Sequence, residues 1–273
     1  FPEYRYDPSV LNNAPVTIDS QDLWTAHKKA KDDLIDYQAS HSYVLFDNKM
    51  LTIGFGRRFT EYKRPILIFK DLDKLGRISR GKVQFLFAGK AHPMDEHGKW
   101  FIKQIHEFSD YLWDNYRVNV AFLENYDMDL AKLMVAGCDV WLNTPRLNNE
   151  ASGTSGMKAA LNGTLNCSTL DGWWIEGYKM NKLAGWALCP KIVERNCEVD
   201  DDALIAETFY TILENEIIPT FYGHRDLWIK RMKNAIMLAS YFNCDRMVKE
   251  YANRAWNLIR QPRWRPKSAV IHT

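Results

Sequence analysis

Short apolar segments that alternate with helical patterns are the feature that most constrains the fold of this chain. Four segments have the composition of buried strands: residues 50–55, 82–88, 119–123 and 140–142. Between them, apolar residues recur at helical spacing over roughly 57–70, 98–111 and 129–136. Strands that alternate with helices form a parallel sheet with helices on both faces. We therefore predict an α/β fold whose ligands bind at the carboxyl ends of the strands.

The two ends of the chain differ from this alternating region. Residues 1–20 are rich in Pro, Asn and Asp, and we expect an irregular lead-in before a helix capped by Ser20 or Asp22. Residues 201–260 have helical spacing throughout, and residues 261–273, rich in Pro, Arg and Trp, are predicted to form a loose tail. We find no internal repeat. The chain begins at Phe1 without an initiator Met, which indicates a fragment of a longer protein.

Charge and cysteine content argue against several classes of function. The chain has 36 basic and 34 acidic residues and a net charge of +2, which does not indicate a nucleic-acid or membrane surface. Its apolar runs are too short to span a bilayer. The five cysteines lack metal-ligand spacing, and no secretory segment is recognisable. We therefore expect reduced thiols, no metal site and a cytoplasmic protein.

A basic segment follows the first predicted strand. Four cations lie within eight residues: Arg57, Arg58, Lys63 and Arg64. A turn that contains glycine lets the backbone approach a ligand, and a helix N-terminus adds partial positive charge. This combination suits a dianion such as phosphate, which arginine binds with two parallel hydrogen bonds. A solvated basic turn would have the same composition, so both interpretations stay open.

Two further segments follow predicted strands. Tyr126, in residues 124–129, is able to donate a hydrogen bond to phosphate, although the segment also fits an acidic helix cap. Residues 152–156, Ser-Gly-Thr-Ser-Gly, form a turn into a helix and would present backbone N–H groups to an anion. Lys158 lies just inside that helix, where it could hold a phosphorylated aldehyde as a Schiff base. A capped helix with an exposed lysine is the alternative.

Residues 150–162, Glu-Ala-Ser-Gly-Thr-Ser-Gly-Met-Lys-Ala-Ala-Leu-Asn, resemble the pyridoxal-phosphate attachment signature of the α-glucan phosphorylases. The resemblance continues through residues 166–174, and upstream it includes residues 52–64, 87–93 and 122–126 in the expected order. The sequence Thr-Ser-Gly-Met-Lys is more similar to that of the short microbial and archaeal members than to that of the long enzymes. Thr60 and Asp127 also depart from the long enzymes, which carry His and Arg there, and Arg57 replaces Lys.

The resemblance implies a role for each matching residue. Lys158 corresponds to the lysine that holds pyridoxal 5′-phosphate. The other cofactor-binding positions are Arg57, Tyr126, Gly153, Thr154 and Ser155. The catalytic positions that gather the substrate phosphate are Arg58 and Lys63, which act together with Lys158. The positions that hydrogen-bond the glucosyl unit are Glu150, Ser152 and Gly153.

The resemblance also implies a reaction and an architecture. The reaction is reversible phosphorolysis of a terminal α-1,4-linked glucose of a glucan by inorganic phosphate. It yields α-D-glucose 1-phosphate with retention of configuration, and the cofactor phosphate relays a proton. The family has a GT-B fold of two Rossmann-like domains. Nothing in residues 1–273 resembles the N-terminal domain, so we expect the C-terminal, cofactor-carrying domain alone. We expect it to be nearly inactive without its partner domain and to self-associate as a homo-oligomer through the uncovered face.

Two other classes of function remain open. A nucleotide-sugar-dependent glycosyltransferase shares the GT-B fold but has no need of a lysine at position 158. A non-enzymatic sugar- or phosphate-binding module would fold without binding the cofactor. Substitution of Lys158 distinguishes a phosphorylase from the first alternative, and a test of cofactor binding distinguishes it from the second.

Overall fold

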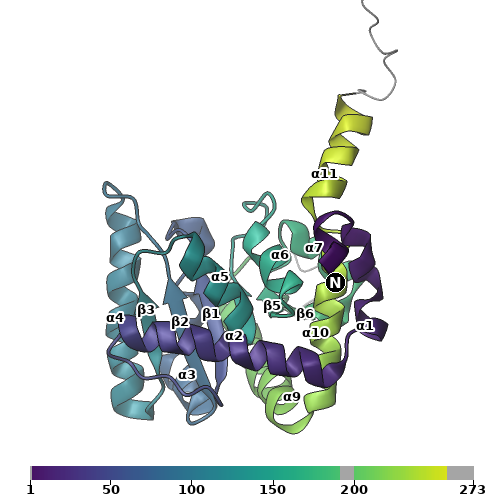
Figure 1. The fold of residues 1–273 in the computed structure, drawn as a ribbon. Coiled ribbons are helices and arrows are strands. Elements are labelled where there is room, and N and C mark those ends of the chain that lie inside the picture. Colours follow the sequence, from purple (N-terminus) through teal and green to yellow (C-terminus); the bar gives the residue numbers. More distant parts are fainter. Residues whose placement is uncertain (1, 191–199, 257–273) are drawn as a thin grey trace, which may run out of the picture.

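The computed structural model describes residues 2–190 and 200–256 (Figure 1). At its centre is a six-stranded sheet with the order β3-β2-β1-β4-β5-β6, and all five strand pairs are parallel. The strands are β1 (Leu51–Gly56), β2 (Val83–Ala88), β3 (Val120–Leu123), β4 (Val140–Asn143), β5 (Leu165–Ser168) and β6 (Gly185–Ala187). This is the strand order of the Rossmann fold. The chain adds strands outward on one side of β1 and then continues on the other side from β4, and ligands of such sheets bind at this switch point between β1 and β4. The predicted α/β parallel sheet is confirmed.

The two faces of the sheet carry separate cores, because successive residues of a strand point to opposite sides. On one face, Leu86 and Trp141 pack with Leu34 of α2 and Met134 of α5. Figure 1 shows α2 lying across this face. On the other face, α3, α4, α8 and α10 contribute to a larger core that contains Phe85. Helices therefore cover both faces, as predicted.

The helices alternate with the strands and then follow them. They are α1 (Ala14–Thr17), α2 (Ser20–His41), α3 (Leu72–Ser79), α4 (Glu96–Tyr116), α5 (Met128–Gly137), α6 (Thr154–Leu161), α7 (Trp173–Met180), α8 (Asp202–Ile212), α9 (Ile218–Gly223), α10 (Arg225–Ala239) and α11 (Cys244–Glu250). The four predicted strands match β1 to β4 within one residue at either end. The helical prediction for residues 201–260 is confirmed through Glu250, with π-helical segments at Leu213–Ile217 and Tyr251–Ala255. The predicted tail 261–273 lies outside the described residues.

The helix predicted over residues 57–70 is wrong. That segment contains only two 3₁₀ helices, Glu61–Lys63 and Leu67–Phe69, and α3 begins at Leu72 with Asp71 as its cap. Proline is the reason, because Pro65 has no N–H group and excludes the residue before it from α-helical geometry. Arg64, the residue before it, takes a left-handed conformation with φ of 45°, which also ends the helical path.

The predictions for the N-terminal segment and the cysteines also need correction. Residues 2–17 form two 3₁₀ helices, Pro2–Arg5 and Pro8–Asn13, and the short helix α1, where we expected an irregular lead-in. The cap of α2 is Asp19, whose carboxylate accepts the N–H groups of Gln21 and Asp22, and neither Ser20 nor Asp22 itself is the cap. Cys138, Cys167 and Cys244 are free thiols, but Cys189 is disulfide-bonded, so the expectation of reduced thiols throughout is wrong.

The pattern also missed strands β5 and β6. Strand β5 has the sequence Leu-Asn-Cys-Ser, in which two polar side chains are buried, so it lacks the apolar run that marks the other strands. Asn166 is buried, and its amide N–H donates to the carbonyl of Gly156 in α6 at 3.1 Å. No helix in the described parts of the chain is long and apolar enough to cross a bilayer.

A buried charged cluster joins α2 to the amino ends of β1 and β4. Asp139 accepts a hydrogen bond from the backbone N–H of Thr52 at 2.7 Å and from the ammonium group of Lys31 at 2.5 Å. His27 Nε2 lies 2.9 Å from the other carboxylate oxygen of Asp139. Burial raises the pKa of Asp139, but Lys31 and His27 outweigh that effect and hold the pKa below its usual range. The carboxylate therefore stays charged and ties three elements together.

Candidate functional site

The candidate site lies where the carboxyl ends of β1, β3 and β4 meet. Gly56, the last residue of β1, is packed beneath two aromatic rings. A Cβ atom at this position would lie 2.9 Å from the Trp141 ring and 3.0 Å from the Tyr126 ring. Glycine at position 56 is therefore required for Tyr126 to lie over the end of β1. The next residue, Arg57, enters the site from this strand end.

Three charged side chains from two loops meet in the site. Arg57 Nη2 donates to Glu150 Oε2 at 2.5 Å, and Lys63 Nζ donates to the same oxygen at 3.0 Å. Burial raises the pKa of Glu150, but the guanidinium of Arg57 and the ammonium of Lys63 outweigh it and hold the pKa below its usual range. The β1 loop and the β4–α6 loop are thus joined by one shared carboxylate.

Arg57 retains unused donors. Its side chain is 8% exposed, and its Nε and Nη1 atoms are buried without a hydrogen-bond partner among the described residues. Unpaired guanidinium donors are costly to bury, and proteins usually supply an acceptor for them. A small pocket of about 10 Å³ lies beside Arg57, and Asn143, Ser152, Gly153 and Trp173 are among its lining residues. The pocket has room for about one water, and the unused donors of Arg57 are also available to an anion that enters the open side of the site.

The first turn of α6 forms another wall of the site. Gly153 precedes the helix with φ of 78°, and no side chain caps the helix at this end. The leading N–H groups of α6 therefore remain available to an anion, whose charge the helix dipole also favours. The hydroxyl of Ser155 is held by Trp141, whose indole N–H donates to it at 3.2 Å. Thr154 is exposed.

Lys158 lies one turn further along α6. It is exposed, and its ammonium group makes no hydrogen bond or ion pair with any residue that the structure describes. Because residues four apart share a helix face, Lys158 is on the same face as Thr154. The buried side of α6 is formed by Gly156, Ala159 and Ala160. The amine of Lys158 therefore lies on the same face of α6 as Thr154, the first residue of the helix.

Tyr126 is suited to donate a hydrogen bond. Burial is the main cause that raises its pKa to about 12, with a contribution from Cys138 and an opposing one from Arg57, so the phenol is protonated at neutral pH. Its neighbour Asp127 accepts the N–H groups of Asp129 and Leu130 as the cap of α5. The helix-cap interpretation of this acidic segment is therefore right for Asp127, and Tyr126 is free of that role.

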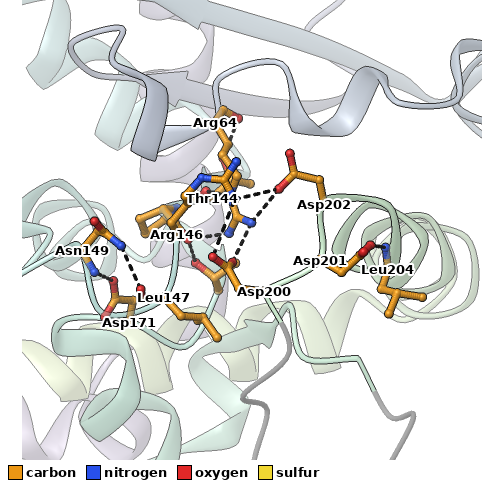
Figure 2. Close-up of polar contacts among 12 residues, drawn as sticks. Arg64, Thr144, Arg146, Leu147, Asn149, Asp171, Asp200, Asp201, Asp202 and Leu204 are labelled. Atoms are coloured by element: carbon orange, nitrogen blue, oxygen red, sulfur yellow. Dashed lines mark hydrogen bonds and ion pairs between the residues drawn. The ribbon is translucent and has the colours of Figure 1, made fainter.

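The four cations of the basic segment have different surroundings in the structure. Arg57 and Lys63 enter the site, whereas Arg58 is exposed and makes no ion pair with a described residue. Arg64 is directed elsewhere, and its guanidinium binds two loop carbonyl groups and the acidic residues Asp200 and Asp202 (Figure 2). The expectation that all four cations face one anion is therefore wrong for Arg64, because these carbonyl groups and carboxylates take up its donors.

One site residue was missed. Asp171 follows β5 and accepts the backbone N–H groups of Asn149 and Glu150 with a single oxygen, Oδ2, at 3.1 and 2.8 Å. It is part of an Asp-Gly turn, a pattern typical of a strand end, but the strand before it was not recognised. Ser152 and Gly153, predicted to bind sugar, line the same pocket as Asp171.

Comparison with known proteins gives a consistent result. The model of the carbohydrate phosphorylase family matches residues 14–183. A maltodextrin phosphorylase of Thermococcus litoralis is 43% identical over 256 residues, which covers 88% of this chain and 30% of that protein. A glycogen phosphorylase of Aquifex aeolicus is 42% identical over 268 residues, covering 89% and 38%. A glycogen phosphorylase of Mycobacterium tuberculosis is 40% identical over 215 residues, covering 76% and 24%. The chain thus spans between about a quarter and two fifths of the length of these relatives.

Proposed function

We propose, from the premise that this chain belongs to the carbohydrate phosphorylase family, that it carries the cofactor- and phosphate-binding part of an α-1,4-glucan phosphorylase. The observation that supports this most directly is Arg57, whose buried guanidinium has two unused donors beside an uncapped helix N-terminus. The relatives named above are phosphorylases, so nothing in the comparisons favours a nucleotide-sugar-dependent glycosyltransferase.

The residues present fit pyridoxal 5′-phosphate. Lys158 supplies an unpaired amine that would hold the cofactor covalently, one helical turn from the N–H groups that would bind its phosphate. Arg57 and the protonated phenol of Tyr126 supply further donors, and Thr154 and Ser155 supply hydroxyls. When bound, the cofactor supplies a phosphate group that can give and accept a proton.

The remaining residues suit the two substrates. We assign Lys63 and Arg58 to inorganic phosphate, and Glu150, with Ser152 and Gly153, to the terminal glucosyl unit. Lys63 donates one hydrogen bond to Glu150, and its ammonium group has further N–H donors for an arriving phosphate. The net reaction breaks the bond between C1 and the 4-oxygen of the next glucose, joins C1 to phosphate and delivers one proton to that 4-oxygen.

The cofactor assignment predicts a single site of covalent attachment. Incubation of the purified protein with pyridoxal 5′-phosphate, borohydride reduction and peptide mass mapping are expected to give one pyridoxyl adduct, on Lys158. The Lys158→Ala variant is expected to lose the adduct, because no other amine lies on that face of α6. Lys179→Ala, which removes an exposed lysine of α7, is the matched control and should keep it. A folded protein without an adduct on Lys158 would contradict the assignment.

Activity of the whole protein is a separate proposal. The matched relatives have more than half of their length beyond the region that this chain spans. We propose that phosphorolysis requires the counterpart of that region, because the reaction needs two substrates positioned across a cleft. The 273 residues by themselves are then expected to bind the cofactor but to release almost no glucose 1-phosphate from a maltodextrin and phosphate. Robust turnover by these residues alone would contradict this.

A further inference from the structure

We infer that Asp171 and Arg64 are positioning residues that brace the loop of residues 144–152 from two sides and so hold Glu150 against the cations of the site. This inference deepens the proposed function and rests on it, because it concerns how Glu150 is presented to the sugar. Neither side chain is assigned to a ligand above, although Asp171 lines the same pocket as Ser152 and Gly153. Each one instead binds the backbone of the loop that carries Glu150 (Figure 2).

The first side of the brace is the turn between β5 and α7. The carboxylate of Asp171, which is 6% exposed, accepts the N–H of Glu150 at 2.8 Å and that of Asn149 at 3.1 Å. Gly172 has φ of 54°, and a Cβ atom there would lie 2.5 Å from the carbonyl oxygen of Ser152. Trp173 donates its backbone N–H to the same carbonyl at 2.9 Å. Three consecutive residues of this turn thus contact the segment 149–152 directly.

The second side is Arg64, which is 4% exposed. Its Nε donates to the carbonyl oxygen of Thr144 at 2.8 Å and its Nη2 to that of Pro145 at 2.6 Å. The hydroxyl of Thr144 donates in return to the carbonyl oxygen of Lys63 at 3.0 Å. The same contacts therefore place both Lys63 and the start of the loop that carries Glu150.

The remaining donor of Arg64 connects this loop to α8. Its Nη1 lies 2.8 Å from a carboxylate oxygen of Asp200 and 3.1 Å from one of Asp202. Arg146 shares both aspartates at 3.7 and 3.4 Å, but its side chain is 37% exposed. A guanidinium can satisfy two carbonyl groups and two carboxylates at once because its donors are fixed in a planar fork, whereas a lysine ammonium is a single point.

A positioning role makes a prediction that a purely structural role does not. Glucose 1-phosphate would need both Glu150 and the cations, whereas inorganic phosphate would need the cations alone. Loosening the loop should therefore weaken glucose 1-phosphate binding and leave phosphate binding nearly unchanged. General destabilisation would weaken both together. The positioning role therefore predicts a selective loss of glucose 1-phosphate affinity relative to inorganic phosphate affinity.

The test compares Asp171→Ala, Asp171→Asn and Arg64→Lys with the matched control Arg146→Ala, which removes a guanidinium from the same two aspartates. Amide hydrogen exchange is measured at Asn149 and Glu150, and calorimetry measures the binding of glucose 1-phosphate and of inorganic phosphate. Asp171→Ala is expected to speed exchange at both amides and to weaken glucose 1-phosphate binding about 10-fold, with phosphate binding changed by less than about 2-fold. Asp171→Asn, which keeps an acceptor oxygen, should largely restore both properties.

Arg64→Lys keeps the charge and is expected to give the same difference between the ligands, so the test does not depend on one variant. Arg146→Ala is expected to match the parent protein. Equal weakening of both ligands, or unchanged exchange at Asn149 and Glu150, would overturn the inference. A parent protein that binds neither ligand would refute the proposed function instead. In that case the amide exchange rates at Asn149 and Glu150 would still test whether Asp171 holds the loop. Faster exchange in Asp171→Ala would support this role, and unchanged exchange would overturn it.

Discussion

Replacing Asp139 with alanine is expected to lower the free energy of unfolding by about 3–5 kcal/mol. The substitution leaves the ammonium of Lys31 buried, with the carbonyl of Met50 as its remaining hydrogen-bond acceptor among the described residues, and it also removes the acceptor for the N–H of Thr52. A buried charge that loses its partner retains its desolvation cost, which is why such a change is so destabilising. Urea unfolding followed by circular dichroism measures the difference.

The matched control is Asp129→Ala, which also removes an aspartate paired with a lysine. The pair of Asp129 with Lys132 is exposed on α5, and surface pairs of this kind contribute at most about 1 kcal/mol. We expect a small change for Asp129→Ala. A loss below about 1 kcal/mol for Asp139→Ala would show that Lys31 finds another partner or solvent, against the buried cluster described above.

The same cluster predicts how stability depends on pH. The pKa of Asp139 is lower in the folded protein than in the unfolded chain, so its contribution is present above the unfolded pKa, which is about 3.9. That contribution is lost as the pH falls through the lowered pKa of the folded state. Below about pH 4, the parent protein should therefore lose stability more steeply than Asp139→Asn. Parallel curves for the two proteins in this acidic range would argue against the assignment.

Replacing Arg57 with methionine is expected to weaken the binding of inorganic phosphate or pyridoxal 5′-phosphate about 100-fold. The estimate takes the loss of one or two charge-assisted hydrogen bonds, each about 1.5–3 kcal/mol. Methionine fills a similar volume, so the pocket keeps its packing while the unused donors disappear. Titration calorimetry with each ligand measures the effect. The pKa of Glu150 should also rise, because Arg57 is the largest of the influences that lower it.

Lys70→Met is the matched control for this charge change. Lys70 follows the same loop but is half exposed and lies 3.8 Å from its partner, Asp202. We expect its removal to change ligand binding less than about 2-fold, because exposed charges are screened by solvent. If Arg57→Met and Lys70→Met weakened phosphate binding equally, the effect would come from overall charge, and the specific role of Arg57 would be rejected.

The positions of β1 to β4 follow from the sequence because buried parallel strands appear as apolar runs, whatever they pack against. The rule that ligands bind at the carboxyl ends of such strands also placed Arg57, Tyr126 and Glu150 at one edge of the sheet in advance. Strand β5 was not predicted, because it has no apolar run. Its buried Asn166 is stabilised by the carbonyl of Gly156, a partner ten residues away that only the packing of α6 brings near.

Adjacent cations show where the sequence stops being sufficient. Lys63 and Arg64 are neighbours in one basic segment, yet Lys63 pairs with Glu150 in the pocket and Arg64 braces the β4 loop. The sequence by itself determined the parallel sheet, the edge that carries the candidate site and the family signature around Lys158, because these depend on local pattern. Only the tertiary structure decided which carboxylate each cation binds and that Asp171 holds Glu150. Those pairings join residues about 20 to 140 positions apart, and their geometry exists only once the chain has folded.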